Sequence, residues 1–245
     1  LSLPPCSVYW LVYARSSQAD TARSSIVEGW GGAQTIAGPL LAIPYQTERQ
    51  ETIVEGNKAV VKTHVIWKEL IFSPETITLD TNIKPERRYH SIYEAVVYEA
   101  SLKGEAKFAV PADLLRSGIK PESLAYDRAE LRFGLSDARG LFGNPPQISA
   151  NQKTLKLQPG HGPADTNGSG FFAALDAPAI NKQSLVVHFN YDFRGNGSLN
   201  LIPRAGDTIW NVKSPWPNPS FKGGFLPTTR AVTDTGFEAT YRIGN

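Results

Sequence analysis

Cysteine, methionine and long apolar runs are scarce in this chain of 245 residues. It contains one cysteine, Cys6, and no methionine. A single cysteine excludes an internal disulfide bond and any zinc site built from several cysteines. No stretch reaches the roughly 18 apolar residues that a membrane-spanning helix needs. Because the chain starts with leucine and has no methionine, we expect it to be a portion of a longer protein.

An excess of charge of one sign is also absent. The chain carries 25 basic and 23 acidic residues, which leaves a net charge of +2. Proteins that bind nucleic acids usually present a strongly basic surface, so we expect no nucleic-acid partner. The hydrophobic share of 41% is that of a folded globular protein rather than of a disordered chain.

The sequence lacks the usual motifs of enzymes. No HExxH, GxGxxG or GxSxG pattern occurs, and no histidine has a histidine partner three to five residues away. We therefore expect no metal site and no cofactor, and an enzymatic role is not favoured. The four histidines are His64, His90, His161 and His188.

The chain consists instead of many short extended runs rich in β-branched and aromatic residues. In residues 185–193 apolar side chains alternate with other side chains, which is typical of a strand with one covered face. This pattern predicts a mainly β fold, a large antiparallel β-sandwich with one or two short helices. Pro111–Gly118 is the clearest short helix, since proline opens it and glycine closes it.

Turn residues predict how some of these strands connect. Gly56 and Asn57 separate two extended runs, as in a tight hairpin, and Asn196–Gly197 is the preferred pair for a type I′ hairpin turn. We expect the latter to join residues 185–193 to the alternation that resumes at Leu199 and Leu201. Gly104 is interpreted as a hinge between two strands.

Two polar pairs are candidate site residues. His161 lies in a glycine-rich loop with Asp165 nearby, and both a catalytic pair and a loop without chemistry are open interpretations. Asp137 and Arg139 belong to "SDARGLFG", a turn in which the aspartate can cap backbone N–H groups and the arginine can pair with it.

The stretch "SPWPNPSFKGGFLP" combines prolines with aromatic residues and cannot form a central strand, because its prolines lack backbone N–H donors. Two interpretations are open: a rigid cover packed over a sheet edge, or an exposed aromatic platform for a sugar, peptide or membrane surface. The candidate residues of this interaction or packing motif are Trp216, Pro217, Pro219, Ser220, Phe221, Gly223, Phe225, Leu226 and Pro227.

The motifs "IAGPLLAIPY", "SDARGLFG", "SLNLIPRAGDT", "SPWPNPSFKGGFLP" and "TGFEATYRI", in this order, resemble those of the bacterial inner-membrane protein family CreD. The resemblance covers about Tyr13 to Asn245. It implies an N-terminal membrane helix, a large extracytoplasmic domain and a C-terminal bundle of membrane helices, of which this chain is the middle domain. By analogy, its topology resembles the super-sandwiches of the mutarotase group or of the YidC periplasmic domain.

The resemblance also implies a division of the chain and a location. Residues 1–16, including the apolar run Val8–Ala14, are interpreted as the end of a membrane helix or as a tag remnant. Residues 17–34, with helical character at Ser17–Glu28, form a linker helix, and residues 35–245 form one periplasmic β-sandwich domain. The implied location is the bacterial inner membrane, with this domain facing the periplasm.

Three functional hypotheses follow. The first is a non-catalytic binding or scaffolding module for cell-envelope integrity and stress response, which the resemblance links to colicin tolerance. Its expected partners are the protein's own membrane helices and an unidentified envelope protein or glycan. The second is a carbohydrate-binding or carbohydrate-active domain with Trp210, Trp216 and His161 at a cleft. The third is a structural cap that orders the neighbouring membrane helices.

Overall fold

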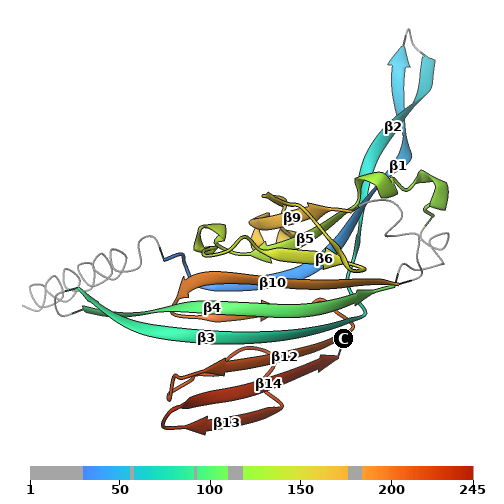
Figure 1. Cartoon of the computed structure of the whole chain (residues 1–245). Helices are drawn as coiled ribbons and strands as arrows, with labels where there is room; N and C mark the ends of the chain where they lie inside the picture. Colours follow the sequence, from blue (N-terminus) through green and yellow to red (C-terminus); the bar gives the residue numbers. More distant parts are fainter. Residues whose placement is uncertain (1–29, 56–57, 91–92, 110–117, 176–183, 245) are drawn as a thin grey trace, which may run out of the picture.

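The computed structural model describes residues 30–55, 58–90, 93–109, 118–175 and 184–244 (Figure 1). In these residues the chain forms two large sheets whose strand pairs are mostly antiparallel. Buried apolar side chains from both sheets form one core cluster between them. The mainly β sandwich predicted from the sequence is therefore confirmed.

The smaller sheet has six strands, in the order β11-β1-β5-β9-β8 with β2 paired to β1. β1 organises this sheet because it pairs in parallel with β11 and antiparallel with both β5 and β2. Its strands are β1 (Gln34–Glu55), β2 (Lys58–Phe72), β5 (Glu130–Leu135), β8 (Leu157–Pro159), β9 (Gly170–Ala174) and β11 (Leu199–Ile202).

The larger sheet has eight strands, in the order β13-β14-β12-β3-β4-β10-β6-β7. All of its pairs are antiparallel except that of β12 with β3. Figure 1 shows β12, β14 and β13 on the side of this sheet away from β5 and β9. Its strands are β3 (Thr76–His90), β4 (Tyr93–Phe108), β6 (Gln147–Ala150), β7 (Lys153–Thr154), β10 (Leu185–Asn196), β12 (Asp207–Ser214), β13 (Thr229–Thr233) and β14 (Gly236–Gly244).

Strand β10 carries the densest part of the core. Every second side chain from Leu185 to Phe193 is buried, as its alternating pattern predicts. Phe189 meets Phe133 of the opposite sheet edge to face, with ring centroids 5.3 Å apart, and Phe133 stacks on Phe171 at 5.2 Å. Aromatic rings therefore fill the space between the two sheets.

The predicted hairpin at Asn196–Gly197 is wrong. β10 pairs with β4 and β6, whereas β11 pairs with β1, so the turn carries the chain from one sheet to the other. Gly197 has a positive φ of 67°, but Asn196 does not have the positive φ that a type I′ turn requires. The Asn196 side chain instead donates to the backbone oxygen of Gly31 at 2.8 Å, and this contact redirects the chain.

The predicted hinge at Gly104 is also wrong. β4 is one continuous strand, and Gly104 pairs with Leu79 of β3 on one side and Phe189 of β10 on the other. A Cβ atom at this position would overlap the Phe189 ring and come within 2.8 Å of a Leu79 methyl group. Glycine is thus required by close packing rather than by bending.

The hairpin predicted around Gly56 and Asn57 is confirmed by its flanking strands, because β1 and β2 stay paired as far as Glu55 and Lys58. The two strands extend together beyond the sheets as an arm (Figure 1). At its base, Arg132 of β5 donates two hydrogen bonds to Glu69 of β2, at 2.6 and 2.9 Å. The Arg128 guanidinium lies 4.9 Å above the ring of Trp67. Charge and cation–π contacts therefore fix the arm to the smaller sheet.

Helical structure in the described residues is limited to four short 3₁₀ helices. The helices predicted at Ser17–Glu28 and at residues 111–117 lie outside the described residues, as does the apolar run Val8–Ala14. From residue 30 the chain passes through a turn into β1. The 3₁₀ helices are η2 (Pro121–Ser123), η3 (Tyr126–Arg128), η4 (Ala138–Gly140) and η5 (Ala164–Thr166).

The close packing at Gly104 gives the first testable prediction. Gly104→Ala should destabilise the protein by about 1–3 kcal/mol, the usual cost of overpacking a core, because Phe189 and Leu79 must move. Gly224→Ala is the matched control, since a Cβ atom there would have no neighbour within 4 Å. Urea unfolding measures both free energies, and equal stability of the two variants would contradict the packing role.

Candidate functional site

A groove of about 630 Å³ lies between the larger sheet, β11 and the connection from β12 to β13. We call this connection, residues 215–228, the Trp216 loop. The floor of the groove is the inner face of the larger sheet where the smaller sheet ends at β11. It contains the side chains of Ile83, Val96, Trp210, Val212, Phe237 and Tyr241. The Trp216 loop and β11 form the two walls.

Trp216 is half-buried rather than packed in the core or laid open to solvent. Its indole Nε1 donates to the backbone oxygen of Asn218 at 2.9 Å, which ties the ring to its own loop. The guanidinium of Arg87, from β3, lies 5.0 Å from the ring centroid. The tryptophan therefore lines the groove as a half-buried ring, and whether it also serves as a binding platform stays a prediction.

The other aromatic residues of the loop divide between anchoring and exposure. Phe221 is half-buried and meets Phe237 of β14 edge to face, at a centroid distance of 5.5 Å. Phe225 lies at the rim of the groove and is 50% exposed. The next residue, Leu226, does not line the groove and is 64% exposed. Of the remaining predicted motif residues, Pro217, Pro219 and Pro227 are half-buried, and Ser220 and Gly223 are exposed.

The floor of the groove is rigid and mainly apolar. Trp210 is only 8% exposed and stacks on Tyr241, with ring centroids 5.1 Å apart. Its Nε1 donates to the Thr81 hydroxyl at 2.9 Å, so its polar atom is already satisfied inside the protein. Trp210 therefore presents an apolar ring and no available hydrogen-bond donor to the groove.

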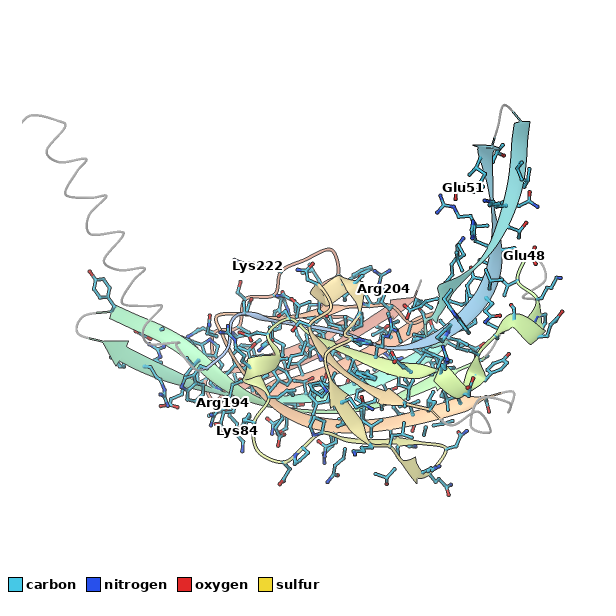
Figure 2. The ribbon with its side chains drawn as sticks, turned by 90° about the horizontal axis from the view of Figure 1, so that it is seen from above. Glu48, Glu51, Lys84, Arg194, Arg204 and Lys222 are labelled. Carbon is cyan, nitrogen blue, oxygen red and sulfur yellow. The ribbon has the colours of Figure 1, made fainter. Side chains whose placement is uncertain are left out.

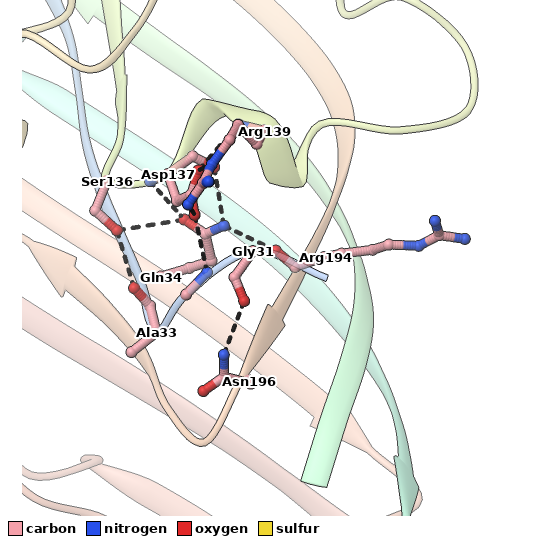
Figure 3. A network of polar contacts seen from close by, with 9 residues as sticks. Gly31, Ala33, Gln34, Ser136, Asp137, Arg139, Arg194 and Asn196 are labelled. Atoms are coloured by element: carbon pink, nitrogen blue, oxygen red, sulfur yellow. Dashed lines mark hydrogen bonds and ion pairs between the residues drawn. The ribbon is translucent and has the colours of Figure 1, made fainter. Parts of the chain in front are cut away.

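Asp137 and Arg139 lie in a different place, around the side chain of Gln34 at the start of β1 (Figure 3). Gln34 is fully buried, and its amide nitrogen donates to the backbone oxygens of Asp137 and Arg194 at 3.0 and 2.8 Å. Its amide oxygen accepts from the Asp137 N–H at 3.1 Å. One side chain thus joins β1, the segment after β5 and the end of β10. We call these contacts the Gln34 network.

Asp137 closes the Gln34 network on its outer side. Its carboxylate accepts from the Gly32 and Arg139 backbone N–H groups at 3.0 and 3.1 Å and is paired with the Arg139 guanidinium at 2.8–2.9 Å. The hydrogen bonds from Arg139 hold the pKa of this carboxyl below its ordinary value of 3.8. The predicted capping role of Asp137 is confirmed, as is its pairing with Arg139, and both contacts hold the chain in place.

The two members of the predicted His161–Asp165 pair have different partners. Asp165 is paired with Arg204, whose Nε donates to it at 3.0 Å. His161 is 65% exposed, stacks on Phe172 at 4.9 Å and has its Nδ1 3.6 Å from the Glu130 carboxylate. His161 does not line the groove that contains Trp210 and Trp216, so the structure does not bring together the three residues of the carbohydrate hypothesis.

A second concavity, of about 830 Å³, lies on the outer face of the larger sheet near β6. Its lining is mostly polar and includes both charge signs, with Asp80, Lys103 and Glu105. His188 lies there with its Nδ1 3.5 Å from Glu105, on the exposed face of β10. In the described parts of the chain, no three His, Cys, Asp or Glu side chains are grouped so that they could hold a metal ion.

Three features of these sites were not predicted from the sequence: the buried Gln34, the Trp30 ring and the edge of β11. Gln34 gave no signal because a lone glutamine before an apolar run is common. The Trp30 ring contacts the guanidinium groups of Arg88 and Arg194, whose central carbon atoms lie 4.1 and 4.7 Å from the ring centroid, and these residues are far apart in sequence. The edge of β11 was missed because these residues were expected to pair with β10.

The fold and the groove define the class of protein, which is a two-sheet β-domain with an apolar groove beside an edge strand. The chain belongs to the CreD family, since the family model described as "Inner membrane protein CreD" matches residues 1–245. It is 26% identical over 246 residues to the inner membrane protein CreD of Escherichia coli (strain K12), covering 99% of this chain and 52% of the relative. The chain therefore spans about half the length of that curated relative. The resemblance in the motifs is confirmed.

No helix among the residues that the structure describes has the length and apolar character needed to cross a membrane.

The Gln34 network gives a second prediction. Gln34→Ala should destabilise the protein by about 2–3 kcal/mol, because it leaves the Asp137 N–H and two partly buried carbonyl groups without their partner. Gln158→Ala removes an exposed amide from β8 and should change the stability little. Thermal and urea unfolding compare the two variants. A Gln34→Ala protein as stable as the control would show that the network does not hold the sheets together.

The depressed pKa of Asp137 gives a third prediction. The pKa of Asp137 in the folded protein lies below its value in the unfolded chain. The contribution of Asp137 to the stability of the fold is therefore complete above about pH 4 and is lost as the pH falls through the folded pKa. Asp137→Asn should therefore lower the free energy of unfolding at neutral pH. Between about pH 5 and 3 the variant should lose less stability than the unmodified protein loses. Unfolding curves at several pH values measure this slope. Asp127→Asn, at an exposed position, should keep the original slope, and an unchanged slope in Asp137→Asn would contradict the prediction.

Proposed function

We propose that this domain is a non-catalytic binding module of an inner-membrane protein, that it faces the periplasm, and that the groove under the Trp216 loop is its binding surface. The observation that carries the proposal is the groove itself, with a volume of about 630 Å³ and a mostly apolar, aromatic lining. Ligand sites usually have volumes of 300–1,000 Å³ and linings of this kind.

The rim of the groove supports the same conclusion. Phe225 and Leu226 expose large apolar side chains next to the opening, where they gain contacts only when something binds. Adjacent exposed apolar side chains at a concave surface are typical of interaction sites rather than of ordinary protein surface. The anchored residues Trp216 and Phe221 hold the loop close to its position, so little conformational entropy is lost on binding.

The polar candidates have structural partners, which favours binding over catalysis. Asp165 is paired with Arg204, and Asp137 is engaged by Arg139 and by backbone N–H groups. The sugar-platform alternative is less favoured, because Trp210 is largely buried and Arg87 lies against the Trp216 ring. These side chains stabilise loops and strands and are not arranged around a common reacting atom.

The inner-membrane part of the proposed location is supported by the family. The matched relative is named as an inner membrane protein and is about twice as long as this chain. The proposed role is to contribute to cell-envelope integrity and stress response, including colicin tolerance, by binding an envelope partner or by supporting the protein's own membrane helices.

A cellular assay tests the groove as the binding surface, and this is the fourth prediction. The full-length protein with Phe225→Glu and Leu226→Glu should lose its contribution to colicin tolerance, because two carboxylates at the rim repel an apolar ligand. Val232→Glu is the matched control: Val232 is 48% exposed on β13 and does not line the groove.

Protein levels in the membrane and the thermal stability of the isolated chain are measured for each variant. Loss of tolerance in the rim variant with normal levels, together with a functional control, supports the proposal. Equal tolerance in the two variants would exclude the groove as the surface on which this role depends.

A further inference from the structure

We propose that the groove takes an extended peptide segment of a partner protein, which adds as a new strand to the open edge of β11 and carries an acidic residue toward Lys222. The inference rests on the proposed function and specifies the ligand class of the same site.

β11 is an edge strand whose second side has no partner among the described strands. It is the last strand in the order of the smaller sheet and pairs only with β1. The Gln34 N–H donates to the backbone oxygen of Ser198 at 3.1 Å, so the backbone groups of Ser198 and Asn200 point toward β1. Backbone groups of alternate residues in a strand point to opposite edges, so those of Leu199 and Leu201 point away from β1.

This open edge borders the groove. The segment Ser198–Leu201 forms one wall, and the apolar side chains of Leu199 and Leu201 pack toward the core between the sheets. Two N–H donors and two C=O acceptors are therefore presented beside an apolar floor. A strand that pairs with this edge would lie on the floor and place every second side chain against Trp210 and its neighbours.

The facing loop is poorly suited to pair with β11 itself. Pro215, Pro217, Pro219 and Pro227 have no backbone N–H, so the Trp216 loop lacks donors at four of its fourteen positions, 215–228. Natural sheets usually cover or charge their exposed edges to prevent unwanted pairing. Here an apolar groove follows the edge instead, which is the arrangement found where proteins bind peptides by strand addition.

The charge of the groove specifies the peptide further. Lys222 of the Trp216 loop is the one charged side chain among the described residues of the lining, and Figure 2 shows it on this loop. In the described residues no carboxylate forms an ion pair with Lys222. Arg87, next to Trp216, is instead paired with Glu94 at 3.0 Å, so Lys222 supplies the positive charge. An acidic residue in the peptide would therefore find a complementary charge at the opening.

The length of β11 sets the length of the segment. Four residues at about 3.3 Å each span about 13 Å, so a segment of roughly four to six residues fills the edge. A lipid chain could occupy the apolar floor but would leave the N–H and C=O groups of Leu199 and Leu201 without hydrogen-bond partners. A peptide backbone can pair with these groups, which favours a peptide as the ligand.

A peptide-binding experiment with the 245-residue chain tests the proposal, and this is the fifth prediction. The probe is a fluorescent ten-residue peptide of alternating valine and threonine with one central glutamate. Two further peptides carry N-methyl groups on alternate backbone nitrogens, one set for each edge of the strand. We expect one N-methylated peptide to bind about tenfold more weakly and the other to bind unchanged, since only one edge of the added strand donates to β11.

Protein variants test the same contact from the other side. Leu201→Pro removes a donor on the open edge and none that pairs with β1, whereas Leu201→Ala keeps the donor and loses similar side-chain contacts. Binding should fall about tenfold in Leu201→Pro relative to Leu201→Ala. The N-methylated peptides do not depend on the folding of either variant, so they decide the question if Leu201→Pro is unstable.

Other outcomes overturn the inference. Equal binding of both N-methylated peptides would show that the groove holds apolar segments without strand addition. Binding of phosphatidylglycerol vesicles with no binding of any peptide would assign the groove to lipid. If peptides do not bind but the rim variant still loses colicin tolerance, the proposed function stands and the peptide inference fails. If peptides bind but the rim variant is fully tolerant, the groove is a peptide-binding surface and only its proposed role in colicin tolerance fails.

Discussion

The burial of one glutamine side chain is the constraint on which much of this structure depends. Gln34 is fully buried at the start of β1, and its amide must be satisfied by the backbone around Asp137 and by the carbonyl of Arg194. A buried amide without partners is costly, so these three segments are held together at one point. Because β1 is the strand that pairs with β11, β5 and β2, its anchoring places most of the smaller sheet.

The groove follows from this placement. The smaller sheet ends at β11, while the larger sheet continues through β12 and β14, so part of its inner face lacks a strand above it. The Trp216 loop covers that face with aromatic side chains and leaves about 630 Å³ between itself and the edge of β11. Unequal widths of the two sheets therefore produce a site in which an apolar floor and an open backbone edge lie together.

Much of the fold could be predicted because strand patterns are local. The alternation in β10 identifies its buried face, and the turn at Gly56 and Asn57 identifies the β1–β2 hairpin. The errors arose where a local signal competed with a distant contact. Asn196–Gly197 is a good hairpin pair, but Asn196 bonds to Gly31 and the chain crosses to the other sheet. Gly104 was interpreted as a hinge, yet glycine is needed there because the ring of Phe189, in a neighbouring strand, occupies the space that a side chain would fill.

By itself, then, the sequence determined the strand-rich class, the family and the prominence of the proline–tryptophan stretch, since composition, period and motif are properties of neighbouring residues. The tertiary structure alone decided that Trp216 covers and lines a groove, that Asp137 belongs to the Gln34 network, and that His161 and Asp165 have separate partners. The physical reason is that strand pairing within each sheet joins residues more than a hundred positions apart, and no local pattern encodes which edge is left open.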